Sequence, residues 1–146
     1  MKWLTVAALT VLVACGPSEA DRARDRVAVE RVLARDVAVA GVSHEADLVL
    51  GKGDRQEAAG IVRSRAIPAA DENARAALAL RPTTPWGKAR VEDLSALTRD
   101  RRASLTSYAA ALEGDDGNAL LASIEAQQGI ERRALALWQT VARNDP

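Results

Sequence analysis

Apolar residues recur at spacings of three and four along four long stretches of the chain, which is the period of an amphipathic α-helix. Turn-like segments rich in glycine and proline separate these stretches at residues 51–53, 81–85 and 114–118. No stretch shows an alternation of period two that would compete with this pattern. The pattern therefore predicts an all-α fold with four helices.

The first helix is expected to begin near Ser18, which forms a capping box with Asp21, and to run to about Leu50. Residues 37–42 are apolar nearly all round, which predicts that this helix is the most buried. The β-branched residues could alternatively indicate a strand, but the apolar stripe spans more than five turns and favours a helix. One inward stripe comprises Val29, Leu33, Val37, Ala40, His44 and Leu48, and a second, adjacent one comprises Val32, Val39, Val42 and Val49.

The second helix is expected from the N-cap residue Asp54 to Leu80. Pro68 lies in its middle, lacks an amide donor and crowds the preceding turn, so we expect a kink or a break near Ile67. The inward residues are Ala58, Val62, Ala66, Ala69, Ala76, Ala77 and Leu80.

The third helix is expected to start at Pro85 with Thr84 as its cap and to end at Gly114. Its inward stripe is Val91, Leu94, Leu97, Leu105, Tyr108 and Leu112, interrupted by Arg101. The fourth helix follows an acidic cap at Asp115 or Asp116 and has Leu120, Leu121, Ile124, Ile130, Ala134, Leu135, Trp138 and Val141 on its buried face.

The short turns between these helices imply that consecutive helices run antiparallel. We therefore expect residues 21–146 to form an up-down-up-down four-helix bundle, with the second helix kinked or broken near Pro68.

The amino terminus has the pattern of a secretory signal peptide. A single cation, Lys2, precedes an uncharged run from Trp3 to Ala14. This run is too short to span a bilayer, which takes about 20 apolar residues. It has the length of a signal-peptide apolar region, so residues 1–14 are expected to be removed.

The residues Leu12-Val13-Ala14-Cys15 resemble the lipobox of bacterial lipoproteins. The resemblance implies diacylglycerol transfer to the Cys15 thiol, cleavage after Ala14 and acylation of the new amino terminus by a fatty acid such as palmitate. Residues 15–20 would then be a short lipidated tether. The alternative is ordinary secretion with a free Cys15, for which Leu12 fits the small-residue cleavage pattern poorly.

The resemblance also implies a location. Gly16, rather than an aspartate, follows Cys15. In a Gram-negative cell this favours the outer membrane, with the protein facing the periplasm. In another bacterium the same anchor would place it on the outer face of the plasma membrane.

The charge balance of the chain bears on its expected partners, and its cysteine content bears on what stabilises the fold. The chain has 20 Lys and Arg against 20 Asp and Glu, and removal of Lys2 would leave the acidic residues one ahead. This balance argues against a nucleic-acid partner, for which a clustered basic excess is expected. Cys15 is the single cysteine, so an acylated chain has no disulfide and packing alone must hold the fold.

His44, the single histidine, is the first candidate for chemistry as a general base or a ligand. A metal site needs three or four ligands, and the chain has no second histidine and no Glu-x-x-His element. The hydroxyls of Ser104, Thr106, Ser107 and Ser123 lie outside any motif that activates a nucleophile. We therefore expect a partly buried, hydrogen-bonded His44, no catalytic residue, no metal and no cofactor.

Several polar or aromatic positions have two interpretations each. Residues 99–102 and 131–133 could bind anions, but their alternating charges favour solvated helix faces. Arg101, Gln127 and Gln128 fall at expected inward positions and predict either a polar layer in the core or an open groove. Trp86 either caps the end of the core or is displayed as an anchor for a partner.

These features favour a non-enzymatic lipoprotein that binds another envelope protein, in addition to the membrane that holds its lipid. In size, class and anchor the chain is similar to the small helical pilotins of secretion systems, which hold a partner's terminal helix. An immunity or inhibitor lipoprotein is a second version. The alternative is a bundle that binds a small molecule or lipid: a continuous apolar groove would favour the helix-binding version, and a closed cavity the small ligand.

Overall fold

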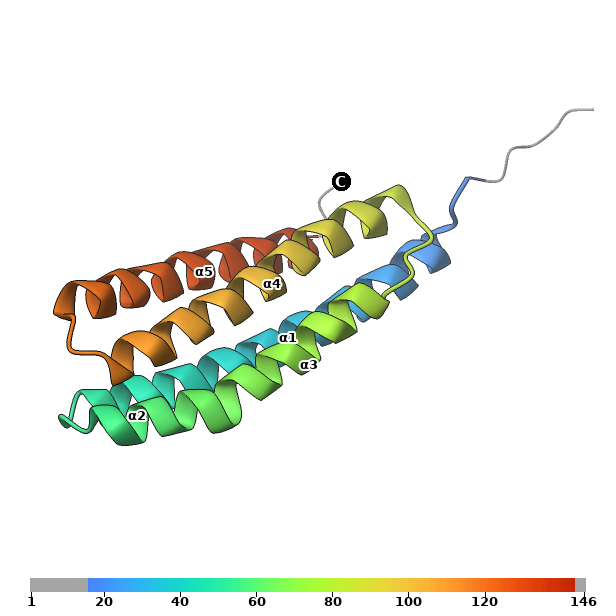
Figure 1. Ribbon diagram of the computed structural model, residues 1–146. Coiled ribbons are helices and arrows are strands. Elements are labelled where there is room, and N and C mark those ends of the chain that lie inside the picture. The colour runs from blue at the N-terminus through green and yellow to red at the C-terminus, as the bar shows by residue number, and fades with distance from the viewer. Residues whose placement is uncertain (1–15, 144–146) are drawn as a thin grey trace, which may run out of the picture.

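The computed structural model describes residues 16–143, which are all-helical and contain no strand. Figure 1 shows an elongated molecule in which the helices lie side by side. Residues 55–79 form one continuous helical segment that contains three elements, so the described residues form four helical segments. The elements are α1 (Glu19–Leu50), α2 (Arg55–Ile61), the π-helix η1 (Val62–Ala66), α3 (Ile67–Ala79), α4 (Pro85–Glu113) and α5 (Gly117–Arg143).

The side chains expected to cap the helices do so. Ser18 accepts a hydrogen bond from the backbone of Asp21, whose carboxylate accepts from the backbone of Ser18. This capping box starts α1 at Glu19, two residues before the expected domain boundary at residue 21. The other caps are Asp54 on α2, Thr84 on α4 and Asp116 on α5.

A change of helix type lies just before Pro68. The π-helix η1 occupies residues 62–66, and the backbone N–H of Ile67 bonds to the carbonyl of Val62. Pro68 then falls in the first turn of α3. Because α3 continues directly from η1, the missing N–H and the ring of Pro68 fall next to the π-helical turn, a common site of helix distortion.

The apolar core consists of two clusters, one toward each end of the molecule. Every segment contributes to both of them. The first cluster contains Val29, Val32, Leu33, Ala77, Trp86, Leu94, Leu97, Ile130, Ala134, Leu137 and Val141. The second contains Val39, Ala46, Ala58, Ala59, Val62, Ala66, Ala70, Leu105, Tyr108, Ala109 and Leu112, with Leu120 and Ile124 packed against it.

A polar position separates the two clusters on each segment. Asp36 lies between Leu33 and Val39 on α1, and Arg101 lies between Leu97 and Leu105 on α4. Asn73 of α3 and Gln127 of α5 occupy the equivalent places on their helices. Of the three residues predicted for a polar layer or an open groove, Arg101 is buried, Gln127 is partly buried and Gln128 is exposed. Asp36 and Asn73, which the sequence did not indicate, are buried at this level together with Arg101.

The first predicted stripe of α1 is wrong at Val37, His44 and Leu48, whereas the second stripe, with Val39, Val42 and Val49, does face the core. Val37 and Leu48 are 53% and 57% exposed, and His44 is exposed as well. The buried face continues instead through Asp36, Val39, Ser43 and Ala46. The reason is that α5 packs mainly against α4 and less against α1, so it does not cover this face of α1. Although residues 37–42 are apolar nearly all round, this stretch of the helix therefore has an open face.

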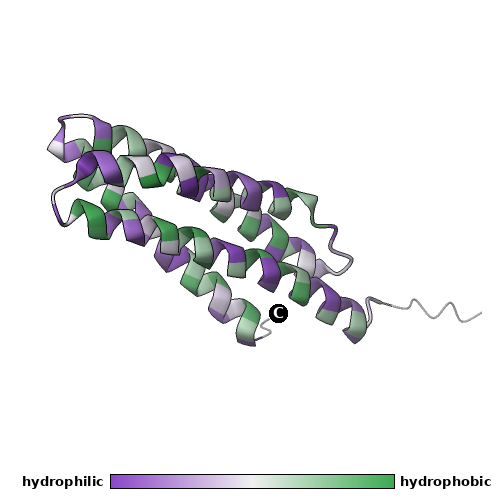
Figure 2. Ribbon diagram, turned by 90° about the horizontal axis from the view of Figure 1, so that it is seen from below, coloured by the Kyte–Doolittle hydropathy of each residue, from purple (hydrophilic) through white to green (hydrophobic). Residues whose placement is uncertain are grey.

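The predicted stripes of α3, α4 and α5 agree better with the structure. Leu121 and Leu135 of α5 are exceptions, at 61% and 58% exposed. Trp138 is partly buried and packs against the first cluster. Figure 2 shows hydrophobic and hydrophilic residues interspersed along every helix. Among the described helices, none combines the length and the apolar content needed to cross a membrane.

Hydrogen bonds tie the helix ends together. Near the amino terminus, the buried carboxylate of Asp25 accepts from the backbone N–H groups of Thr83 and Thr84 and from the Thr84 hydroxyl, the last at 2.7 Å. At the opposite end, Arg55 donates to the carbonyl oxygens of Ala111 and Gly114 at the end of α4. These bonds join α1 to the turn before α4, and α2 to the turn after it.

Candidate functional site: a groove between α1 and α5

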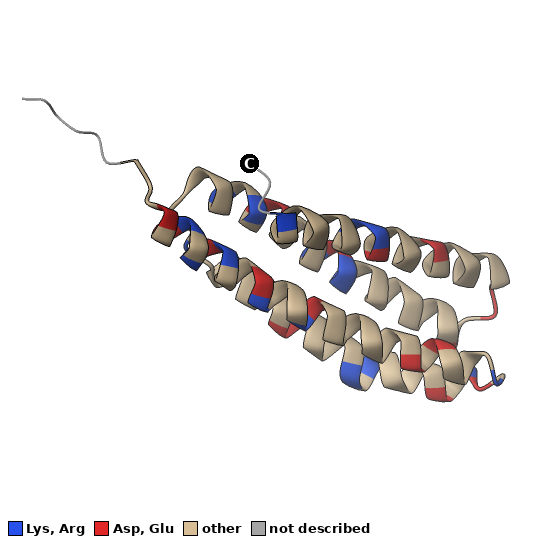
Figure 3. Ribbon diagram, turned by 180° about the vertical axis from the view of Figure 1, so that it is seen from behind, with Lys and Arg blue, Asp and Glu red and all other residues tan. Residues whose placement is uncertain are grey.

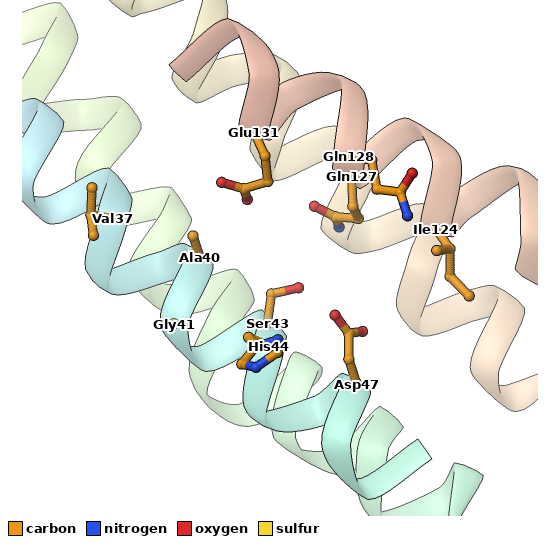
Figure 4. A pocket seen from close by; sticks show the side chains of 10 residues that line it. All are labelled: Val37, Ala40, Gly41, Ser43, His44, Asp47, Ile124, Gln127, Gln128 and Glu131. Carbon is orange, nitrogen blue, oxygen red and sulfur yellow. The ribbon is translucent and has the colours of Figure 1, made fainter. Parts of the chain in front are cut away.

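A groove of about 420 Å³ lies between α1 and α5. Figure 4 shows its two walls facing each other, with Ser43 and Asp47 extending toward α5 and Gln127 and Glu131 extending toward α1. The lining residues are Val37, Ala40, Gly41, Ser43, His44 and Asp47 of α1 and Ile124, Gln127, Gln128 and Glu131 of α5.

Small side chains keep this groove open. Ala40 and Gly41 form the middle of the α1 wall, and a Cβ atom added to Gly41 would meet no atom within 4 Å. In addition, α5 packs extensively against α4 and much less against α1. The two walls therefore stand apart where larger residues would otherwise close the gap.

Exposed hydrophobic side chains extend the groove at both ends. Val37 and Leu48 lie on the α1 side, and Leu121 and Leu135 lie on the α5 side. On each helix these residues are three, four or seven positions from lining residues, which places them on the same face. They are four of the six large hydrophobic residues exposed among residues 16–143. Large exposed hydrophobic side chains that gather beside one groove are typical of an interaction site.

Glu131 connects the groove to the buried polar layer. Its carboxylate accepts a hydrogen bond from Arg101 Nη1 at 2.6 Å. Arg101 in turn donates from Nε and Nη2 to the two carboxylate oxygens of Asp36, at 2.7 and 2.8 Å. Burial alone would lower the pKa of Arg101, but its bonds to Asp36 and Glu131 raise it, so the guanidinium stays charged.

A second carboxylate of the groove is held in the same way. Asp47 Oδ1 accepts a hydrogen bond from the hydroxyl of Tyr108 at 2.6 Å. Burial, followed by the bond to Asp47, raises the pKa of Tyr108, so this hydroxyl remains a donor. Both carboxylates of the groove are therefore oriented by side chains beneath them.

Gln127 is the most unusual polar group in the groove. Its Nε2 and Oε1 atoms are both buried, and neither has a hydrogen-bond partner among the described residues. Buried amide atoms are almost always hydrogen-bonded, and exceptions call for an explanation such as a bound ligand. The neighbouring Gln128 is exposed and also lines the groove.

The structure corrects the expectation for His44. The side chain is exposed in the groove wall and makes no hydrogen bond or ion pair with another described residue. The predicted buried, hydrogen-bonded histidine is therefore wrong. Asp47 and Glu131 share the groove with His44, but the partners of these carboxylates are Tyr108 and Arg101. Among residues 16–143, no group of three His, Cys, Asp or Glu side chains is placed to hold a metal ion.

The charged cluster at residues 99–102 divides into two parts. Asp100 pairs with Arg99 and with Arg133 at 2.9 Å, and Arg102 pairs with Asp71, all at exposed or partly exposed positions. The hydrogen bond from Arg133 lowers the pKa of Asp100. These residues lie on the solvated helix face that was expected for the cluster. Arg101 lies in the interior instead, since its side chain is 1% exposed.

Trp86 lies at one end of the first core cluster and is 8% exposed. This is the position expected of an aromatic residue that caps the core. Cys15, the expected site of lipid attachment, and residues 1–14 lie outside the described part of the chain.

The sequence does not reveal the groove. The Gln127 and Gln128 doublet indicates either a polar layer or an open groove, but the apolar pattern of α1 predicts that its facing wall belongs to the core. The available signal was Gly41 in the middle of the apolar stretch, because glycine is unfavourable in a helix interior and supplies no side chain to pack.

No protein-family model, no curated protein and no solved structure matches this chain.

Proposed function

We propose that this protein is a lipoprotein of the cell envelope, anchored through Cys15 and facing the periplasm, whose α1–α5 groove binds an amphipathic helix of another envelope protein. The proposal makes it a non-enzymatic binding module. The observation that supports it best is the groove itself, an apolar channel between two helices that is open to solvent and flanked by four exposed hydrophobic residues.

The shape of the groove fits a helix better than a small ligand. Val37 and Leu48 are eleven residues apart on α1, which corresponds to about 16 Å at the helical rise, or three turns. A partner helix with apolar residues at positions i, i+3, i+4 and i+7 has the pattern that such grooves take. The groove is open along its length, whereas a small-molecule site would enclose most of its ligand.

The charge of the groove defines the partner further. Asp47 and Glu131 are the acidic residues that line it, and no lysine or arginine does. A partner helix with a lysine or arginine beside its apolar face would complement these carboxylates. Its polar groups could also bond to the amide of Gln127.

We also propose an up-down-up-down order for the four segments, with the second segment bent near Pro68. The bonds from Asp25 to the turn before α4 and from Arg55 to the end of α4 support this order. The π-helix directly before Pro68 supports the bend, since such turns often occur where a helix is distorted.

The test is site-specific photo-crosslinking in intact cells of the source organism. A photoreactive phenylalanine analogue would replace Val37 in the groove or Leu78, which is 69% exposed on α3 and lies outside it. We expect Val37 to capture one partner and Leu78 not to capture it. The crosslinked peptide should have the spacing of an amphipathic helix and contain basic residues.

A blocking variant provides the control. Gly41→Phe places a large side chain in the groove without meeting the core, because the space around Gly41 is open. It should abolish the crosslink from Val37 without lowering thermal stability, because it also removes a glycine from a helix interior. Equal capture from both positions, or capture that survives Gly41→Phe, would contradict the groove as the binding site. A partner from a secretion apparatus would favour the pilotin-like version, and a toxic enzyme the immunity version.

A further inference from the structure

A second pocket lies at the N-terminal end of the bundle, defined here by residues 16–26 and 81–90. It has a volume of about 480 Å³ and is lined mainly by apolar groups, with two arginines among them. The residues that matter to its chemistry are Pro17, Arg22, Pro85, Trp86, Ala89 and Arg90.

The two arginines are held against apolar surroundings. The guanidinium carbon of Arg22 lies 5.6 Å from the centre of the Trp86 ring, a cation–π arrangement that orients the group. The Arg90 side chain is 18% exposed, and its Nε lies 3.3 Å from Oδ2 of Asp93. The Asp93 side chain is 54% exposed. Partly buried guanidinium groups bind phosphate oxygens well, because they are weakly hydrated and present paired donors.

The pocket is adjacent to the expected anchor. Pro17 lines it and is two residues from Cys15, and only residues 16–18 lie between Cys15 and the first helical residue, Glu19. Three residues span at most about 10 Å. With Cys15 acylated, the mouth of the pocket is therefore held at the depth of the lipid headgroups.

The two ends of the bundle differ in net charge, and Figure 3 shows where acidic and basic residues lie along the ribbon. The N-terminal end carries Arg22, Arg24, Arg26, Arg81, Lys88 and Arg90 against Glu19, Asp21 and the buried Asp25. Residues 45–65 and 108–120 at the opposite end carry Glu45, Asp47, Asp54, Glu57, Glu113, Asp115 and Asp116 against Lys52, Arg55, Arg63 and Arg65. Two of these arginines, Arg63 and Arg65, pair with Glu113 and Glu45. An anionic membrane surface would attract the first end and repel the second.

We propose that this pocket binds the headgroup of an anionic phospholipid. The phosphate accepts hydrogen bonds from Arg22 and Arg90, and the glycerol and first acyl carbons lie against Trp86, Pro85 and Ala89. The position of the pocket at the membrane rests on the proposed anchoring through Cys15, whereas binding of the lipid itself does not. The bundle then stands with its N-terminal end on the bilayer and its acidic end away from it.

The test uses the full chain with Cys15→Ser, so that its result is independent of lipidation. The protein is titrated with dihexanoyl phosphatidylglycerol below its micelle concentration, and the indole N–H resonance of Trp86 is followed by NMR. We expect a saturable shift with phosphatidylglycerol and a much weaker one with the zwitterionic dihexanoyl phosphatidylcholine. Residues 1–14 are the same in every variant, so any lipid binding by this segment is equal in all of them and does not affect the comparison.

Two variants test the arginines. Arg22→Gln combined with Arg90→Gln should weaken phosphatidylglycerol binding about tenfold or more, since two charge-assisted hydrogen bonds are lost. Arg35→Gln combined with Arg132→Gln removes the same charge from exposed positions outside the pocket and should leave the affinity unchanged. Ala89→Glu, at an exposed position, should abolish binding by repelling the phosphate and does not depend on altering a packed side chain.

Three results would overturn the proposal. The first is equal binding of phosphatidylglycerol and phosphatidylcholine. The second is undiminished phosphatidylglycerol binding by the folded variant with Arg22→Gln and Arg90→Gln, or by Ala89→Glu. The third is an equal response to inorganic phosphate at the same concentration, which would make free phosphate the ligand. None of these results bears on whether Cys15 is acylated, which membrane fractionation of the wild-type chain tests separately.

Discussion

At the scale of single residues, a few polar side chains hold the apolar helices in one arrangement. Asp36 and Arg101 form a buried pair between α1 and α4, and Asp25 binds the backbone at the start of α4. Each is buried and each has its bonding groups matched by a specific partner. Loss of one partner therefore leaves a buried charge or a set of unpaired donors, which costs more than the bond itself contributes.

Arg101→Met should lower the free energy of unfolding by about 3–5 kcal/mol, because Asp36 is left as an uncompensated buried charge. Urea unfolding followed by circular dichroism measures the change. Arg102→Met on the same helix is the control: its pair with Asp71 is largely exposed, so a loss below about 1 kcal/mol is expected. Adding Asp36→Leu to Arg101→Met should restore most of the stability, and failure to do so would contradict this account.

Asp25 should make stability depend on pH in the acid range. Burial by itself raises the pKa of this carboxyl, but hydrogen bonds from Thr84 and Thr83 outweigh it and lower the pKa. The stabilisation is then fully present above the unfolded-state pKa of about 3.9 and is lost as the pH falls below it. Asp25→Asn should cost about 1–3 kcal/mol at pH 7. In urea titrations, its difference from wild type should shrink toward pH 3, and a constant difference would argue against the carboxylate's role.

Gly87 is needed because Asp25 lies against it. A Cβ atom at Gly87 would come within 2.3 Å of Asp25 Oδ2, so Gly87→Ala should destabilise the fold by about 1–3 kcal/mol through overpacking. Gly60 in α2 has no atom within 4 Å of a Cβ, and Gly60→Ala should stabilise by about 0.5–1 kcal/mol. Melting temperatures that shift in the same direction for both variants would contradict this distinction.

At the scale of elements, α1 is shared among more neighbours than its hydrophobic pattern suggests. It packs against α2, η1, α3, α4 and α5, whereas α5 packs mainly against α4. The adjacent apolar face, with Val37 and Leu48, is therefore left exposed beside the groove. An amphipathic pattern gives the faces of a helix, but the packing of neighbouring helices determines which face is covered.

Gln127→Met should stabilise the free protein by about 1–3 kcal/mol, because it removes two buried amide atoms that lack hydrogen bonds. The same variant should weaken the crosslink from Val37 to the partner. Thermal unfolding and crosslinking yield on one preparation measure both effects. A variant that is no more stable than wild type would show that the amide is satisfied in the free protein. Gln128→Met, at an exposed position, is the matched control and should change stability little.

At the scale of the whole molecule, the proposed lipid anchor and the two surface sites lie at different places on one rod. The lipid-binding pocket is at the N-terminal end, and the groove is lined by residues from Val37 onward on α1. A protein held at the membrane by one end can present the groove to a partner in the space above the bilayer. The two proposals are thus compatible, and separate variants test each of them.

Cys15→Ser should prevent acylation of the protein and reduce its share in the membrane fraction. Acyl chains contribute about 0.8 kcal/mol per buried methylene, so several chains make attachment effectively permanent. The measurement is membrane fractionation, with metabolic labelling by a fatty-acid analogue. Because Cys15 is the single cysteine of the chain, Cys15→Ser has no thiol to acylate. Fatty-acid label that persists in this variant would therefore contradict the lipobox interpretation.

Much of the candidate site could not be predicted from the sequence. The capping residues and the inward stripes of α3 and α4 were correct because they depend on local hydrogen bonds and on helical period. His44 was assigned to the interior, whereas Arg101 had two interpretations, as part of a solvated charged face and as part of a polar layer in the core. The sequence could not decide either case, because a residue at a given position on a helix is buried or exposed according to which other helix lies opposite it.

The sequence by itself determined the helices, their ends and the turns between them, because caps, glycine, proline and the spacing of apolar residues act over a few neighbouring positions. Only the tertiary structure decided that Arg101 is buried against Asp36, that Gln127 lies between two apolar clusters and that α1 and α5 stand apart. These outcomes depend on contacts between residues distant in the sequence, in particular on how α5 packs against α4, which leaves the small residues Ala40 and Gly41 of α1 facing an open groove.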